Sequence, residues 1–120
     1  MSSLVTRLEE IEQDSPIALL RRRKLVGEKM LWAYINLDKG CHVAMHSHEN
    51  EQIGFVISGR VLFRLGEEGS PGYREVIVEG GSVVHLPSNL PHGVDVLEDA
   101  VILDVLSPPG PMGVDKQGGR

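Results

Sequence analysis

The sequence predicts a single all-β domain, and three observations support this fold class. The chain has 120 residues, which is the length of one domain. Apolar and polar residues alternate with a period of two almost everywhere after residue 17. The apolar runs are short, rich in β-branched residues and bounded by Gly, Pro, Asn or Asp. Together these features are typical of a barrel or a sandwich.

The first 20 residues form an N-terminal extension that leaves two structures open. Thr6 and Glu9 have the spacing of a capping box, and the apolar residues Leu4, Leu8 and Ile11 follow one another by about one helical turn. A proline at position 16 would end such a helix. The extension is therefore expected to be a short helix or an extended strand that pairs with another subunit.

Residues 21–107 are expected to form the β-barrel, and residues 108–120 a separate tail. The clearest alternating runs cover residues 31–37, 61–65, 75–79 and 101–105. The tail is rich in Pro and Gly and shows no periodicity, so we expect it to be irregular.

Composition argues against several classes of partner. The chain carries 12 Lys and Arg against 17 Asp and Glu, which provides no broad basic surface for nucleic acid. The basic run 21–24 is interpreted as a solvated edge beside an acidic N-terminus. A single cysteine, Cys41, excludes an internal disulfide and is interpreted as a small apolar core residue. No signal peptide and no membrane-spanning stretch is visible, so a cytoplasmic protein with no membrane partner is expected.

Four residues form the candidate metal site. His46 and His48 are one residue apart in an alternating segment, so on a strand both side chains point to the same face. Gln52 follows four residues later, and His92 lies forty residues beyond it, after glycine and proline turn signals. Three imidazoles and one amide oxygen suit a divalent transition metal, and Ni, Mn, Fe, Zn and Cu all accept such ligands.

This ligand set also predicts how the metal would act. Neutral imidazoles and a neutral amide leave the double charge of the ion uncompensated, so the site should favour an anionic small molecule. Four protein ligands leave about two positions open in an octahedral ion. Asp104 shares its strand face with Ile102 and Leu106, and is the candidate general acid or base. A structural aspartate at a strand end is the alternative.

The remaining candidates near these residues receive other interpretations. His42 is expected to be exposed or hydrogen-bonded, and His85 is not expected to bind metal. Glu49 and Glu51 are alternative carboxylate ligands if Gln52 is not the fourth ligand.

The spacing of these residues resembles the two signature motifs of the cupins. The first is Gly40-x5-His46-x-His48-x3-Gln52-x6-Gly59, with Gln where many members have Glu, and the second is Gly81-x5-Pro87-x-Asn89-x2-His92. The second motif has Asn89 at a glycine position and Val96 where the pattern ends in asparagine. The resemblance implies a double-stranded β-helix, that is a jelly-roll barrel, with the metal inside its mouth. It also implies a homodimer.

Residues 21–109 are similar to the pectin-degradation cupins, which linearise cyclic unsaturated uronates. The similarity rests on four stretches: residues 22–27, 46–59, 91–93 and 103–109. It implies a metal shell of His46, His48, Gln52 and His92, and an active-site aspartate at Asp104.

Two positions depart from that family. Leu106 stands where an aromatic residue is usual, and Gly110 where an arginine is usual. An arginine would give a carboxylate substrate a bidentate ion pair, so its absence weakens the case for a uronate unless Arg60, Arg64 or an N-terminal arginine takes its place. The sequence thus predicts a metal-dependent enzyme acting on a small oxygenated substrate, either carboxylated or derived from a carbohydrate. A metal-dependent dioxygenase and a non-catalytic metal- or sugar-binding sensor remain the alternatives.

Overall fold

The computed structural model describes residues 4–117 and has an all-β fold, as the sequence predicts. Eight strands are present in this range, together with two short 3-10 turns, η1 (Leu8–Glu10) and η2 (Gly113–Lys116). The strands are β1 (Gln13–Asp14), β2 (Leu20–Val26), β3 (Leu31–Leu37), β4 (His42–His46), β5 (Glu51–Leu65), β6 (Arg74–Glu79), β7 (Ser82–Leu86) and β8 (His92–Ser107). No helix among these residues is long and apolar enough to cross a membrane.

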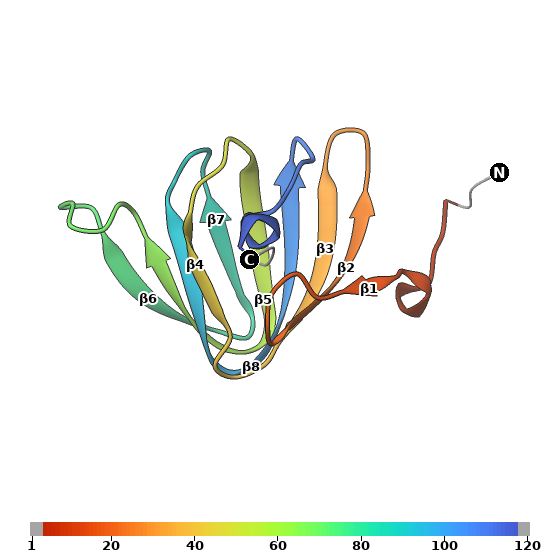
Figure 1. Ribbon diagram of the computed structural model, residues 1–120, viewed down its shortest axis with the longest axis horizontal. Coiled ribbons are helices and arrows are strands. Elements are labelled where there is room, and N and C mark those ends of the chain that lie inside the picture. Colours follow the sequence, from red (N-terminus) through yellow and green to blue (C-terminus); the bar gives the residue numbers. More distant parts are fainter. Residues whose placement is uncertain (1–3, 118–120) are drawn as a thin grey trace.

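The two longest strands, β5 and β8, take part in both layers of the barrel. Near one end of the molecule, residues 100–107 of β8 lie between β3 and residues 51–58 of β5, which in turn pairs with β7. Near the other end, β4, residues 92–95 of β8 and residues 60–65 of β5 lie side by side, and β6 completes the layer. The strands curve around a common interior (Figure 1). This two-layer arrangement is that of a jelly roll.

Gly59 lies where β5 passes from one layer to the other. Its φ is +93°, and a Cβ built on it would lie 2.2 Å from the carbonyl oxygen of Asp99. The register between β5 and β8 is irregular on both sides of this residue. A glycine is therefore required at the bend, since any side chain would meet both strain and a clash.

The interior is filled by the inward-facing residues of the alternating runs. In β3, buried and half-buried residues alternate without exception, and Leu31, Ala33, Ile35 and Leu37 are the buried ones. Cys41 is buried as well, as the sequence predicts. Burial raises the pKa of its thiol, which keeps the group protonated and unreactive.

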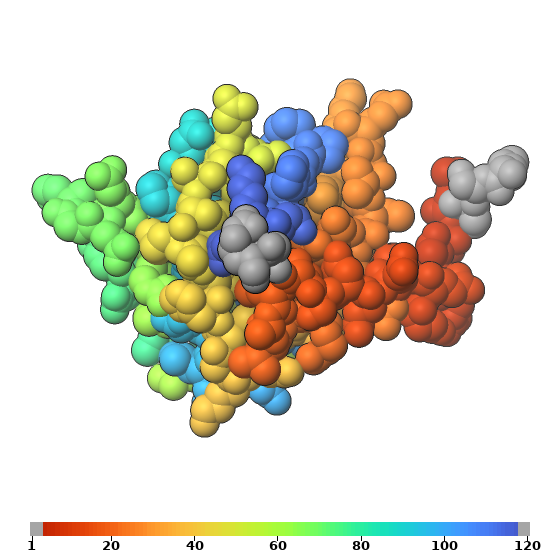
Figure 2. All heavy atoms as spheres, viewed as in Figure 1, coloured from red at the N-terminus to blue at the C-terminus, as the bar shows by residue number. Residues whose placement is uncertain are grey.

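Within residues 4–20, the N-terminal extension contains the 3-10 turn η1 and the two-residue strand β1, and is otherwise irregular until β2 begins at Leu20. Arg7 rather than Thr6 precedes this turn, and its amide nitrogen donates to Glu10. Strand β1 pairs with β2 of the same chain. The extension runs along one side of the molecule and away from the barrel (Figures 1 and 2). Residues 1–3 of the extension and 118–120 of the tail lie outside the described range.

The interpretation of run 21–24 as a solvated edge is wrong for one residue. Arg22 is 2% exposed, because the alternation of β2 turns it inward. Its guanidinium forms ion pairs with Asp14, at 2.8 Å, and with Asp115 from the tail, at 2.7 Å. Both carboxylates are partly exposed, so a buried cation is compensated by anions at the surface.

Candidate metal centre

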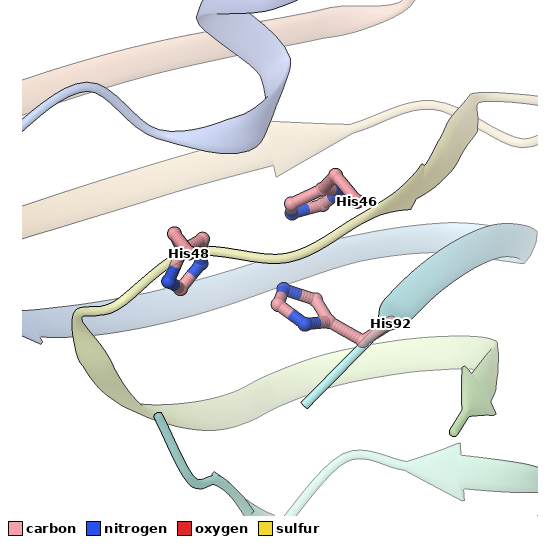
Figure 3. A group of neighbouring side chains, drawn as sticks. All are labelled: His46, His48 and His92. Carbon is pink, nitrogen blue, oxygen red and sulfur yellow. The ribbon is translucent and has the colours of Figure 1, made fainter. Parts of the chain in front are cut away.

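Three histidines converge in the barrel mouth (Figure 3). His46 ends β4, His48 lies in the connection to β5, and His92 begins β8 opposite His46. One ring nitrogen from each lies within 4.8 Å of the others. His48 is therefore not on a strand, although its ring lies beside those of His46 and His92.

Backbone carbonyls determine which nitrogen of each ring faces the centre. The Nδ1 atoms of His46, His48 and His92 lie 2.8, 3.0 and 2.9 Å from the carbonyl oxygens of Ala44, Asn50 and Leu90. A carbonyl oxygen can only accept a hydrogen bond, so each Nδ1 must carry the proton. Each Nε2 is then left with a free lone pair, as metal-ligating histidines require.

Burial keeps two of these rings neutral. It lowers the pKa of His92 to about 4, and a neighbouring imidazole adds to the effect. The pKa of His46 is also lowered, again mainly by burial. A neutral ring is the form that binds a metal, so both rings are in the metal-binding form at neutral pH.

The fourth predicted ligand, Gln52, lies beside the histidines near the start of β5. Its Oε1 is 3.2 Å from Nε2 of His48, and that nitrogen carries no proton if Nδ1 does. Two facing lone pairs repel each other unless a cation lies between them. Ligands about 2.1 Å from one metal and at right angles would lie about 3 Å apart, which is close to the distance seen here.

A buried atom without a partner also fits a metal. Among the described residues, Nε2 of His92 is one of two buried side-chain nitrogens that have no hydrogen-bond partner. Such a group is costly to bury. A metal bound by the three rings would satisfy it, so the residues present fit the group that the sequence predicts.

Asp104 is buried next to Gln52, on the inward face predicted for it. Burial raises its pKa to about 6, although a hydrogen bond from the Gln52 side chain opposes the shift. Since Gln52 donates through its Nε2, its Oε1 is turned toward the histidines. Gly54 faces Asp104 across the strand pair, and a Cβ there would lie 2.7 Å from the carboxylate. Asp104 thus orients a predicted ligand and can also hold a proton.

The other polar candidates lie outside this cluster. His42 is exposed, and its Nδ1 lies 2.6 Å from Asp95. His85 is exposed and contacts Glu51 at 2.7 Å. Glu51 is therefore engaged at the surface, and Glu49 is not part of the group that could hold a metal. The exposure of His42 and its contact with Asp95 agree with the interpretation given to that residue from the sequence.

The tail contributes residues that the sequence does not reveal. Residues 112–117, named here the C-terminal strap, lie across the barrel mouth in front of the strands (Figure 1). Met112 and Val114 are buried and line the cavity at the histidines. A Cβ on Gly113 would lie 2.2 Å from Nε2 of His46, so only glycine allows this approach.

Two polar contacts hold the strap to the barrel. The carboxylate of Asp115 pairs with Arg22 and accepts a hydrogen bond from the amide of Met112. The side-chain amide of Gln117 bonds both to N–H and to C=O of Ala44, at 2.9 and 3.3 Å. The expectation of an irregular tail is wrong only for Gly113–Lys116, which form the 3-10 turn η2. Without periodicity, the only signal available was the pair of apolar residues around Gly113.

Comparison with known proteins agrees with this fold. The sequence matches the Cupin domain family over residues 33–106. It is 32% identical to an uncharacterized protein of Streptomyces coelicolor over 111 residues, which cover 86% of this chain and 94% of that protein. Similar solved structures include an RmlC-like cupin from Shewanella frigidimarina, with a TM-score of 0.79 and 20% identity over 90% of this chain and 93% of that one.

Two further solved structures are similar to the chain. KdgF from a Halomonas species has a TM-score of 0.74 and 24% identity, over 85% of this chain and 92% of that one. Oxalate decarboxylase from Lactobacillus farciminis has a TM-score of 0.78 and 15% identity, but the match covers 93% of this chain and only 35% of the larger enzyme. At these identities the structures show the fold alone. The family match, the jelly-roll topology and the histidine cluster together establish that the chain belongs to the cupins.

Proposed function

We propose that the protein is a metal-dependent enzyme that acts on a small oxygenated molecule, carboxylated or derived from a carbohydrate. The observation that carries the proposal is the convergence of three Nε2 atoms whose Nδ1 protons are all held by backbone carbonyls. His46, His48, Gln52 and His92 would hold the metal. When bound, the ion would supply Lewis-acid chemistry by polarising a substrate oxygen.

The residues of the chain support a proton transfer at that substrate. Asp104 is the group placed to make it, because its buried carboxyl group lines the cavity next to Gln52. The hydrogen bond from Gln52 orients its carboxylate. Apolar side chains form the rest of the cavity wall beside these groups. The reaction class we propose is proton transfer or ring opening at the carbon next to a polarised oxygen.

The similarity to the pectin-degradation cupins supports a small oxygenated substrate but does not support a uronate. KdgF shares the fold, but among the described residues that line the cavity there is no lysine or arginine to receive a uronate carboxylate. Arg22, the buried candidate, is already paired with Asp14 and Asp115. We therefore propose a substrate whose own oxygens bind the metal, rather than one held by an arginine.

The homodimer is a further proposal. Ile53 and Phe55 of β5 and Val83 of β7 are exposed on the outer face of one layer, where Phe55 and Val83 are cross-strand neighbours. Such an apolar patch suits a second copy of the chain. Light scattering should give twice the chain mass of 13.1 kDa, and the mass of one chain would contradict the proposal.

The first experiment is the metal content of protein purified without a metal-binding tag. We expect close to one transition metal ion per chain, and its identity directs the activity assay. That assay is run with and without oxygen, using small oxo acids and unsaturated uronates. Turnover without oxygen supports the proposal, whereas turnover only in its presence favours a dioxygenase. Binding without turnover favours a sensor, and protein that takes up no metal contradicts the proposal.

A further inference from the structure

The cavity beside the histidines has one polar end and apolar walls. His46, His92, Gln52 and Asp104 form the polar end. Away from it the lining is aliphatic or aromatic, with Ile35, Phe63 and Ile102 among the residues that contribute. A ligand held at the polar end must therefore place the rest of its body against apolar surface, where a hydroxyl group would lose its hydrogen bonds to water.

The C-terminal strap completes this apolar lining. Met112 is 6% exposed and Val114 is 7% exposed, although they belong to a tail at the edge of the barrel. Their side chains are buried because the strap turns them into the mouth and because Asp115 and Gln117 hold the strap in place. Two of the cavity walls thus come from a segment outside the strands.

The strap also limits the size of the cavity. The cavity has a volume of about 60 Å³, whereas sites for drug-sized ligands have about 300–1,000 Å³. A sugar ring with its hydroxyl groups is poorly matched to so small and apolar a space. A short acid with an unbranched or once-branched carbon chain is matched much better.

From these observations we infer that Met112 and Val114 are specificity-determining residues of the site. The structure assigns to it a ligand with metal-binding oxygens at one end and a compact apolar body at the other. This inference rests on the proposed function, because the ligand's oxygens are held by the metal. It narrows the substrate from oxygenated molecules in general to short-chain apolar ones.

The test compares probes that share one metal-binding head. Cobalt-loaded protein is titrated with 2-oxobutyrate and with hydroxypyruvate, which differ only by a methyl group in place of a hydroxyl group, and binding is followed by the visible spectrum of the cobalt ion. We expect 2-oxobutyrate to bind at least about fivefold more tightly, because the hydroxyl group would be buried without a partner. Equal or tighter binding of hydroxypyruvate would overturn the inference.

The second arm tests the strap. In the wild type, 4-methyl-2-oxovalerate should bind more weakly than 2-oxobutyrate because its longer body meets Met112. In Met112→Ala or Val114→Ala the ratio of the two affinities should shift by about tenfold toward the longer probe. Met112→Leu, which keeps the volume, should leave the ratio within about twofold.

Val78→Ala is the matched control for Val114→Ala. Val78 is 8% exposed, like Val114, but it lies on β6 and does not line this cavity. An unchanged ratio in both strap variants, or an equal shift in the control, would overturn the role of the strap. If the wild type binds no cobalt, the proposed function itself fails. If it binds cobalt but does not show the expected order of probes, only the inference about the ligand fails.

Discussion

The metal centre and the C-terminal strap meet at one point but are built in different ways. The ligands are held from within the barrel, each ring fixed by a carbonyl two residues away in the chain. The strap is held by contacts between residues far apart, such as the pair of Arg22 and Asp115, 93 positions from one another. The tautomer of each ligand ring is thus fixed by its local backbone, whereas the placement of the strap depends on contacts between distant residues.

Removal of a ligand should have the largest effect. His92→Ala leaves two imidazoles and one amide, so metal affinity should fall by more than about 100-fold. Circular dichroism should show that the barrel still folds, because the ring contributes no hydrogen bond between strands. Elemental analysis after dialysis measures the retained metal. Stoichiometric metal in the double variant His46→Ala, His48→Ala would contradict the ligand assignment.

A substitution in the strap should also lower the affinity of the centre for metal. In Gly113→Ala the new methyl group would lie 2.1 Å from Cδ2 of His46, so either the ring or the strap must move. We expect metal affinity to fall by about 10- to 100-fold, as when a group that orients a ligand is lost. Calorimetric titration with zinc or cobalt measures the change.

Gly110→Ala is the matched control in the same tail. A methyl group at that position would meet only Nδ2 of Asn50, at 3.4 Å. Its metal affinity should equal that of the wild type. If Gly113→Ala binds metal as tightly as this control, the strap and the centre are independent, and the contact between them has no functional weight.

The sequence predicts the parts of the site that depend on a local pattern, and it does not predict the contact between the strap and the barrel. The alternation of residues 31–37 and 101–105 predicts which side chains are inward, and Asp104 is found on the expected face. The spacing of His46 and His48 predicts their convergence even though β4 ends between them. In contrast, the Pro- and Gly-rich tail has no period, and nothing near it in the sequence identifies Arg22 as its partner.

A change of charge at the centre should have an intermediate effect. Gln52→Glu keeps an oxygen ligand, so metal should be retained, but the added negative charge lies next to the Asp104 carboxylate. We expect anionic probes such as 2-oxobutyrate to bind about tenfold more weakly, because the metal's charge is then partly compensated. Gln52→Ala serves as the control for loss of the ligand without added charge. Unchanged or tighter binding of the anion would contradict the argument.

Acidification should release the strap before it unfolds the barrel. Partial burial alone would raise the pKa of Asp115, but the hydrogen bonds from Arg22 and from the Met112 amide outweigh it, so the pKa is lowered. Lys24 adds a smaller attraction, and Asp14 shares the same guanidinium. A lowered pKa gives stability that is present above the unfolded value of about 3.9 and lost as the pH falls through the folded one. The protection of the strap amides from hydrogen exchange should therefore be constant near neutral pH and decline in acid.

Hydrogen exchange in metal-free protein measures this directly. The amides of Asp115 and Gln117, which bond to carbonyls within the strap, should exchange faster below pH 4 after correction for the intrinsic rate. Asp115→Asn should remove this dependence, because the amide keeps the shape but carries no titrating charge. Asp38→Asn is the matched control, since it breaks a surface pair with Arg21 and should leave the strap unchanged. If both variants behave like the wild type, the charge of Asp115 does not hold the strap, and Gln117 together with the burial of Met112 and Val114 must do so.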